Sequence, residues 1–293
     1  MSTTRVYMKK LGSFALMCLF LLAAGQTDAL AVPASGPKDA VLIAAFGTSV
    51  EKARSSYAAI EKHVRLAFPD REIRWSWTAH SLLKTEKSRL SPQEALAKLA
   101  TEGVKNVSVL SLHVIPGTEY NNLIRTARAF EGLPKGIRRI TVSPPLLHDT
   151  ESLKTVAEIL VQSLPEKRKA GEAVVFVGHG THHPAGVYYP ALQHYLRGLD
   201  KNVFVGTVED NLNLETVLGE LKANSLRKAW IVPLMTVAGD HALNDLFGKE
   251  ADSWKQTFIA NGIQVETVAR GLGENPALAG QWVEGLKNAQ KKH

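Results

Sequence analysis

The sequence is almost free of cysteine. Its only cysteine, Cys18, lies in an apolar run near the N-terminus, so the remainder of the chain can form no disulfide and offers no thiolate to a metal ion. Any metal site in that remainder must be built from histidine, aspartate and glutamate.

Motifs for nucleotides and for serine hydrolases are also missing. There is no Gly-x-x-x-x-Gly-Lys-Ser/Thr loop and no Gly-x-Ser-x-Gly elbow. Gly178-His179-Gly180 begins like a dinucleotide fingerprint, but His183 stands where the third glycine is needed, so we expect no nucleotide. The formal net charge is +7, yet Lys and Arg are scattered and not interleaved with aromatic residues. This distribution argues against nucleic acid as a partner and suits an anionic small molecule.

Residues 1–31 have the pattern of a secretory signal peptide. Lys9 and Lys10 precede an apolar run at 14–24, and Ala29–Ala31 offers a small-residue cleavage site. The run is too short to span a bilayer, which favours a cleaved signal peptide over an uncleaved anchor, the alternative interpretation. Translation starting at Met8 instead of Met1 is a second alternative. We therefore expect a periplasmic protein that has no membrane attachment after cleavage.

From residue 39 onward, short β-branched runs alternate with amphipathic stretches. Strand-like runs at 40–47, 72–80 and 106–115 are separated by helical patterns at 50–68 and 91–103, and 242–254 is also helix-like. Ser91 and Glu94 have the spacing of a capping box, with Pro92 at the first helical position. This alternation predicts an α/β fold with mostly parallel sheets.

The two halves of the chain resemble each other. Residues 41–49 align with 174–182, 73–80 with 202–209, and the segment from 104 with that from 226. The alignment places His80 opposite Glu209 and Glu119 opposite His241. Chance similarity among α/β strands is the alternative, but three landmarks in one order favour an internal duplication. We expect two Rossmann-like domains, at 32–150 and 151–293, that face a central cleft.

Three candidate metal ligands follow three consecutive strands of the C-terminal half. His179, Glu209 and His241 each come at a carboxyl end, where open parallel sheets bind ligands. A single histidine at a strand end is usually structural, but a His, Glu and His set with open positions can hold an accessible divalent ion. His182 and His183 are interpreted as rim residues, because adjacent residues normally point apart.

Five motifs together resemble one enzyme family over residues 38–290. They are AAFGTS (44–49), LHVIPGTEY (112–120), GHGTHHPA (178–185), VPLMTVAGDHALNDL (232–246) and GLGEN (271–275). The sequence resembles the anaerobic sirohydrochlorin cobalt chelatases, class II chelatases with a ferrochelatase-like fold, and within them a periplasmic branch. The resemblance implies a lyase of tetrapyrrole and cobalamin biosynthesis, which inserts Co²⁺ or Fe²⁺ into sirohydrochlorin and releases two protons.

The resemblance also implies roles for individual residues. The two active-site histidines of the family fall on His179 and His241, which would hold the metal together with Glu209. Substrate-binding positions fall on His113, Glu119, Phe46 and Thr48. The divalent metal is then a substrate, and the partner is a tetrapyrrole.

Two other functions remain open from the sequence. A periplasmic protein that binds and carries metal or tetrapyrrole without turnover would have the same ligands, and a zinc hydrolase is a third option. Histidine and glutamate ligands do not identify the metal. At such sites the affinity rises in one general order across the divalent ions, whichever ion the protein uses. A homo-oligomer is also left open.

Overall fold

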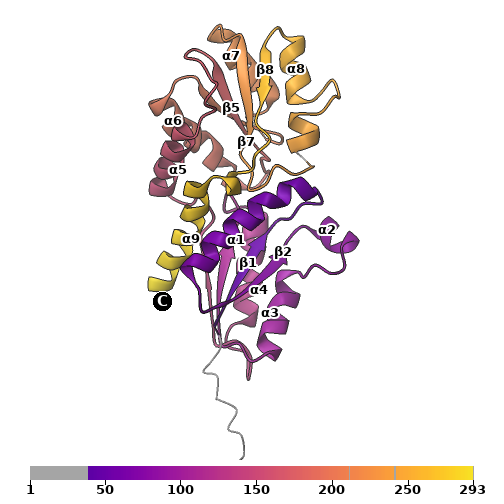
Figure 1. Cartoon of the computed structure of the whole chain (residues 1–293), viewed down its shortest axis with the longest axis vertical. Coiled ribbons are helices and arrows are strands. Elements are labelled where there is room, and N and C mark those ends of the chain that lie inside the picture. The colour runs from indigo at the N-terminus through magenta and orange to yellow at the C-terminus, as the bar shows by residue number, and fades with distance from the viewer. Residues whose placement is uncertain (1–38, 211, 241, 293) are drawn as a thin grey trace, which may run out of the picture. The chain divides into compact units, whose positions relative to one another are not determined.

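The computed structural model describes residues 39–210, 212–240 and 242–292, which all belong to one compact unit. Within them lie two four-stranded sheets in which all neighbouring strands are parallel (Figure 1). The first has the order β2-β1-β3-β4 and the second the order β6-β5-β7-β8, so the two topologies are the same. The predicted fold of two Rossmann-like halves is confirmed.

The bounds of the strands are as follows. The first sheet contains β1 (Asp39–Ala45), β2 (Glu72–Trp77), β3 (Asn106–Ser111) and β4 (Arg139–Val142). The second contains β5 (Ala173–Gly178), β6 (Val203–Thr207), β7 (Lys228–Pro233) and β8 (Gln264–Thr267).

Helices cover the faces of both sheets. The α-helices are α1 (Ser55–Ala67), α2 (His80–Thr85), α3 (Pro92–Thr101), α4 (Thr118–Phe130), α5 (Thr150–Gln162), α6 (Tyr188–Leu199), α7 (Leu214–Ala223), α8 (Trp254–Ala260) and α9 (Pro276–Lys291). Short 3₁₀ helices lie at η1 (Glu51–Arg54), η2 (Pro184–Val187) and η4 (Leu272–Glu274), and η3 (Ala242–Leu246) is a π-helix. No helix of the described residues is long and apolar enough to cross a membrane.

Local sequence sets where several helices begin. The predicted capping box of α3 is confirmed: Ser91 Oγ accepts from the Glu94 backbone N–H, and the Glu94 carboxylate accepts from the Ser91 N–H at 2.8 Å. Asp149 and Ser152 form an equivalent box at α5. These side chains satisfy N–H groups that have no partner inside the helix, which stabilises each helix start.

The predicted helix at 242–254 is wrong. Residues 242–246 form only the short η3, and α8 begins at Trp254. The Gly248 N–H bonds to the Asn244 carbonyl, and Ser253 donates to the Gly248 carbonyl at 3.0 Å while its side chain caps α8. Ser253 therefore starts a new helix where the apolar periodicity suggested a continuous one.

Strands alternate their side chains between two apolar layers. Ala40, Leu42 and Ala44 of β1 pack with α3 and α4, whereas Val41 and Ile43 pack with α1 and α9. In the second sheet, β5 alternates in the same way between α7 and α8 on one face and α5 and α6 on the other. The faces covered by α1, α9, α5 and α6 share one continuous core cluster.

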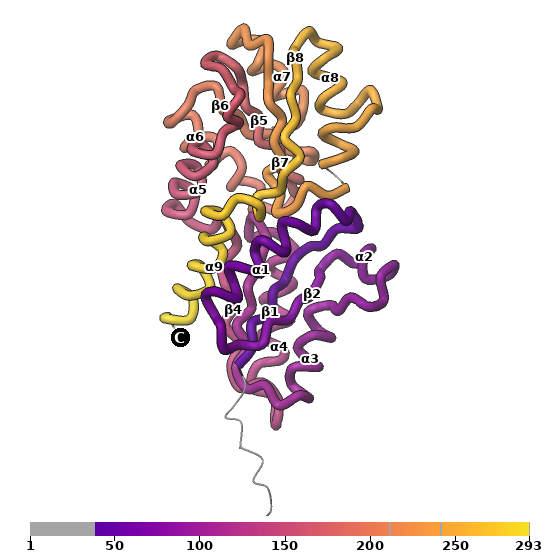
Figure 2. The backbone as a smooth tube through the Cα atoms, in the orientation of Figure 1, coloured from indigo at the N-terminus to yellow at the C-terminus, as the bar shows by residue number. Residues whose placement is uncertain are grey.

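If each repeat is counted through the helix after its fourth strand (β1 to α5 and β5 to α9), the two repeats exchange their last helices. α5 follows β4 of the first sheet but packs beside α6 of the second half. α9 follows β8 of the second sheet but packs beside α1 and on β3 and β4 (Figures 1 and 2). Trp282 of α9 is 1 % exposed, and its Nε1 donates to the His113 carbonyl at 3.4 Å. Each half therefore completes the helical layer of the other.

The strand register corrects one part of the sequence alignment. Val41 pairs with Ile73, and its counterpart Val174 pairs with Val203, one residue beyond the partner that the alignment gave. The predicted pairing of His80 with Glu209 is therefore wrong, and Ala79 corresponds to Glu209. β6 is buried throughout and has no alternation of polar and apolar residues, so its hydrophobic pattern did not fix how it aligns with the alternating strand β2.

Candidate functional site

A cavity of about 720 Å³ lies at the carboxyl ends of both sheets. It is lined by the loops that follow β1, β3, β5, β6 and β7, by α2, and by the start of α4. This is where open parallel sheets bind their ligands. Six predicted site residues line it: Phe46, Thr48, His113, Glu119, His179 and Glu209. The seventh, His241, lies outside the described residues, and its neighbour Asp240 lines the cavity.

His179 and Glu209 are adjacent on the wall that the second sheet contributes. His179 Nδ1 lies 3.9 Å from Glu209 Oε2, and the side chains are 40 % and 46 % exposed. Imidazole and carboxylate bonds to zinc are about 2.0–2.2 Å, so two ligands of one ion lie at most about 4 Å apart. The distance between His179 Nδ1 and Glu209 Oε2 is therefore at the upper limit for two ligands of one ion. Among the described residues no group of three or more His, Cys, Asp or Glu could hold a metal ion, so this pair alone is an incomplete site.

The two glycines around His179 allow close packing of the protein on itself. Gly180 has φ +87°, and a Cβ there would lie 1.9 Å from the Glu209 carbonyl oxygen. A Cβ at Gly178 would lie 2.4 Å from the Tyr189 ring. The Gly-His-Gly segment thus brings the backbones of β5 and β6 together beyond their ends, where Glu209 N–H donates to the His179 carbonyl at 2.8 Å.

His113 lies on the wall that the first sheet contributes. Its Nδ1 is 2.9 Å from Ser111 Oγ, and its Nε2 is 3.4 Å from Thr78 Oγ1. Burial lowers the pKa of His113 to about 4, because desolvation disfavours the imidazolium. His113 is therefore a neutral hydrogen-bonding group at neutral pH.

The duplication makes the two walls comparable position by position. Glu209 N–H donates to the His179 carbonyl, and in the first half Ala79 N–H donates to the Phe46 carbonyl at 3.0 Å. Phe46 and Ala79 therefore stand where the second half has His179 and Glu209. Phe46 is 48 % exposed and lines the cavity. One wall carries the possible metal ligands, and the other presents an apolar ring.

Charge at the cavity is acidic. Glu119, Glu209 and Asp240 line it, and no lysine or arginine does so in the described part of the chain. Glu119 lies in the first turn of α4, where the helix dipole favours a carboxylate. The positive net charge of the chain is thus not gathered at this cavity, whose carboxylates favour a cation.

Two tyrosines of the cavity were missed by sequence reasoning. Tyr57 and Tyr189 line it from α1 and α6, and burial raises the pKa of both, that of Tyr189 to about 12. Each is hydrogen-bonded to the backbone of an equivalent glycine, Gly47 or Gly180. The sequence did contain a signal for them. If the alignment of the two halves is allowed a gap of one residue, Tyr57 is paired with Tyr189.

The two histidines that were interpreted as rim residues do not line the cavity. His182 is exposed. His183 Nδ1 accepts from the Ala185 N–H at 3.1 Å and caps η2, and its Nε2 lies 3.2 Å from Asn121 Nδ2 of α4. His183 thus connects the two halves at the edge of the cavity.

Known proteins resemble this chain over most of its length. Residues 39–291 match the family described as cobalt chelatase (CbiK). The chain is 35 % identical to the sirohydrochlorin cobaltochelatase CbiKC of Nitratidesulfovibrio vulgaris, covering 86 % of this chain and 90 % of that one. It is 33 % identical to the sirohydrochlorin cobaltochelatase of Salmonella typhimurium, covering 86 % and 96 %. The sirohydrochlorin chelatase SirB from Bacillus subtilis subspecies spizizenii, solved in complex with cobalt, has a TM-score of 0.58 at 17 % identity, covering 87 % and 96 %, and supports the fold.

Proposed function

The chain belongs to the cobalt chelatase (CbiK) family, and on that premise we propose that it inserts Co²⁺ into sirohydrochlorin. In this reaction the metal ion replaces two pyrrole protons, which leave the macrocycle. The observation that carries the proposal is the cavity itself. It places the His179–Glu209 pair on one wall and the exposed ring of Phe46 at the matching position of the other.

We assign the metal to His179, Glu209 and His241. An open set of three ligands suits a metal that must be released, because the four nitrogens of the macrocycle have to displace the protein ligands. The exposure of His179 and Glu209 leaves room for water on the incoming ion. The carboxylate adds a negative charge that offsets the dehydration of the dication.

Protons require a base that titrates near neutral pH. Imidazole is such a base, and we propose that His179 and His241 accept the two pyrrole protons once the macrocycle has displaced them from the metal, when their ring nitrogens are free. His113 is a poor final acceptor, because burial lowers its pKa to about 4. Its proposed role is to hydrogen-bond the macrocycle in the neutral form.

The first half would hold the macrocycle. Phe46 offers an apolar face to the ring, Thr48 lies beside it on the same loop, and His113 and Glu119 provide polar contacts along that wall. Because no basic residue lines the described cavity, the substrate carboxylates are expected to point outward to solvent.

The function is tested by turnover. Purified protein is incubated with an excess of sirohydrochlorin and Co²⁺, or Fe²⁺ in a parallel assay, and metallation is followed by absorption spectroscopy. An enzyme metallates many equivalents of macrocycle. A protein that only binds or carries the substrates saturates at one equivalent, and that result would replace the proposed function by transport.

Variants test the residue roles. His179→Ala removes a ligand and a base together, so we expect kcat to fall by about 10²- to 10⁴-fold, with a smaller effect on macrocycle binding. Glu209→Gln keeps the shape but removes the charge, and we expect a weaker affinity for Co²⁺. His182→Ala is the matched control and should stay near wild type. An inactive His182→Ala beside an active His179→Ala would contradict the assignment.

We also propose that the chain is exported and cleaved near Ala31. The family match starts at residue 39, so the predicted signal segment lies outside the matched region. N-terminal sequencing of the protein from the cell envelope should begin after Ala31. A sequence that begins at Met1 or Met8 on soluble envelope protein would refute cleavage.

A further inference from the structure

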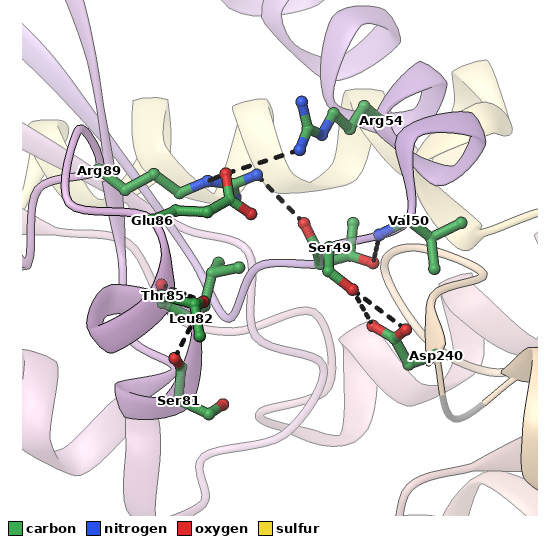
Figure 3. Close-up of polar contacts among 10 residues, drawn as sticks. Ser49, Val50, Arg54, Ser81, Leu82, Thr85, Glu86, Arg89 and Asp240 are labelled. Atoms are coloured by element: carbon green, nitrogen blue, oxygen red, sulfur yellow. Dashed lines mark hydrogen bonds and ion pairs between the residues drawn. The ribbon is translucent and has the colours of Figure 1, made fainter.

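The loop Met235–Asp240, which follows β7 and precedes position 241, is tied to the first half of the chain. Thr236 Oγ1 donates to the Leu112 carbonyl, beyond the end of β3, at 2.7 Å. Ser49 Oγ donates to both carboxylate oxygens of Asp240, at 2.8 and 3.1 Å (Figure 3). Between these two bonds, a Cβ on Gly239 would lie 2.8 Å from Thr48 Oγ1, so the Gly239 backbone is in close contact with the Thr48 side chain.

The segment that contains Ser49 is held in place by Arg89, which is itself bound by its neighbours. The Thr48 carbonyl accepts from Arg89 Nη2 at 3.2 Å, and Arg89 Nε donates to Glu86 at 2.8 Å. Arg54 reaches the same carboxylate at 3.6 Å (Figure 3). The Arg89 guanidinium also lies over the Trp77 ring, 4.6 Å from its centroid. Asp240 is therefore bound by Ser49, and the backbone next to Ser49 is itself held by Arg89.

The duplication supplies an internal comparison for this contact. The loop after β3 is the counterpart of the loop Met235–Asp240, and both make the same backbone bonds. Leu146 and Leu147 donate to the carbonyls of residues 113 and 114, as Leu272 and Gly273 donate to those of 235 and 236. The shared bonds therefore belong to the fold of each half.

Among the described residues, the hydroxyl ties of the loop Met235–Asp240 have no counterpart at the equivalent positions of the loop after β3. Val114 stands in the place of Thr236 and has no hydroxyl group, and Thr118 stands in the place of Asp240. A Cβ on Gly117, the counterpart of Gly239, would meet only Ile115 of its own loop, at 3.8 Å. The loop after β3 receives a bond from Trp282 at the His113 carbonyl, but the hydroxyl contacts of Thr236 and Asp240 belong to the loop that precedes the proposed ligand His241.

We propose that Thr236 and Ser49 are positioning residues for the metal. Their hydroxyl groups hold the loop Met235–Asp240 on the first half, so the metal affinity of the second half depends on a side chain of the first half that does not touch the ion. This inference rests on the proposed function. It adds that the two halves of the duplication are coupled through this loop.

The test is the affinity for Co²⁺ of the purified protein without macrocycle, measured by titration of its visible absorption. Removing one hydrogen bond shifts an equilibrium by roughly 2- to 10-fold, and we expect the Kd for Co²⁺ to rise by that factor in Thr236→Val and in Ser49→Ala. Thr236→Ser keeps the hydroxyl group and should restore the affinity. Ser49→Ala leaves the Asp240 charge in place, so its effect reports position rather than charge.

Matched controls are available in the first half of the chain. Thr101 Oγ1 donates to the Lys98 carbonyl at 2.8 Å, and Ser55 Oγ donates to the Lys52 carbonyl at 3.0 Å, both on exposed helix surfaces. Thr101→Val and Ser55→Ala should bind Co²⁺ like wild type. Thermal unfolding of every variant separates a general loss of stability from a loss of metal affinity.

The outcomes separate this inference from the function beneath it. If wild type turns over and binds Co²⁺ but Thr236→Val and Ser49→Ala keep the wild-type Kd, the positioning role is wrong and the chelatase assignment stands. A fall in affinity that Thr236→Ser does not restore would also overturn it. If wild type neither binds Co²⁺ nor turns over, both are overturned.

Discussion

At the scale of single residues, surroundings set the chemistry of each histidine more than residue type does. His179 is 40 % exposed and lies 3.9 Å from the Glu209 carboxylate, where an incoming ion can reach it. His113 is enclosed by the first wall, and burial lowers its pKa to about 4. Two imidazoles in one cavity thus differ: His179 is accessible to an incoming ion, and His113 is a neutral hydrogen-bonding group.

The depressed pKa of His113 predicts a pH dependence of stability. The native state keeps His113 neutral down to about pH 4, while in the unfolded chain it protonates near pH 6.5. Between these values the unfolded state binds the extra proton, so this contribution is fully present above about pH 6.5 and is lost as the pH falls toward 4.

His113→Gln cannot protonate, and its urea midpoint should therefore fall less steeply than that of wild type between pH 6.5 and 4. Carboxylates with lowered pKa values, such as Asp149 and Asp200, remain in both proteins and cancel in the comparison. Equal slopes in the two proteins would contradict the neutral assignment.

At the scale of elements, the position of α9 does not follow from the order of elements along the chain. It comes after β8 of the second sheet but packs on the first. It begins with Asn275 as N-cap and Pro276 in its first turn, so its start is local. Its apolar face, with Trp282, Val283 and Leu286 buried, packs on the first half rather than on the sheet that precedes it. α9 thereby packs on the sheet whose strand β3 leads to His113.

Truncation of this buried face should destabilise the protein strongly. We expect Trp282→Ala to lower the free energy of unfolding by about 3–5 kcal/mol, since it leaves a large cavity beside α1. Glu284→Ala on the exposed face of the same helix should change it by no more than about 0.5 kcal/mol. Denaturant unfolding of both variants checks the prediction, and equal effects would place α9 away from the core.

At the scale of the molecule, the duplication produces two similar sheets with unlike walls. The second half keeps His179 and Glu209 where the first half has Phe46 and Ala79. The halves are also interdependent, because α5 and α9 are exchanged between them and a single core cluster includes both helices. A cavity built from both halves is held by this exchange as well as by the contacts of the loop Met235–Asp240.

The exchange predicts that the halves do not fold alone. A chain ending at residue 149 lacks α9 over its sheet, and a chain starting at 150 carries α9 without α1 beneath it. We expect each fragment alone to lack cooperative unfolding by circular dichroism, and the coexpressed pair to associate and recover it. A monomeric fragment with a sharp transition would show that the packing of α9 on the first half is dispensable.

The sequence by itself determined the parallel α/β fold, the start of α3 at Ser91 and the common edge that receives His179 and Glu209. These features depend on periodicity and capping over a few neighbouring residues, and on the rule that parallel strands end at one edge. The predicted sites at Phe46, Thr48, His113 and Glu119 also came from the sequence, but through a family resemblance and not through physical pattern.

Tertiary structure alone decided which helix covers which sheet, the register of β2 and β6, and the neutral state of His113. It also decided that Ser49 meets Asp240. The apolar faces of α5 and α9 would fit either sheet, and a strand that is buried on both sides, as β6 is, can slip by one residue without exposing an apolar run. Such choices depend on packing between residues far apart in the chain, because every local pattern is compatible with more than one of them.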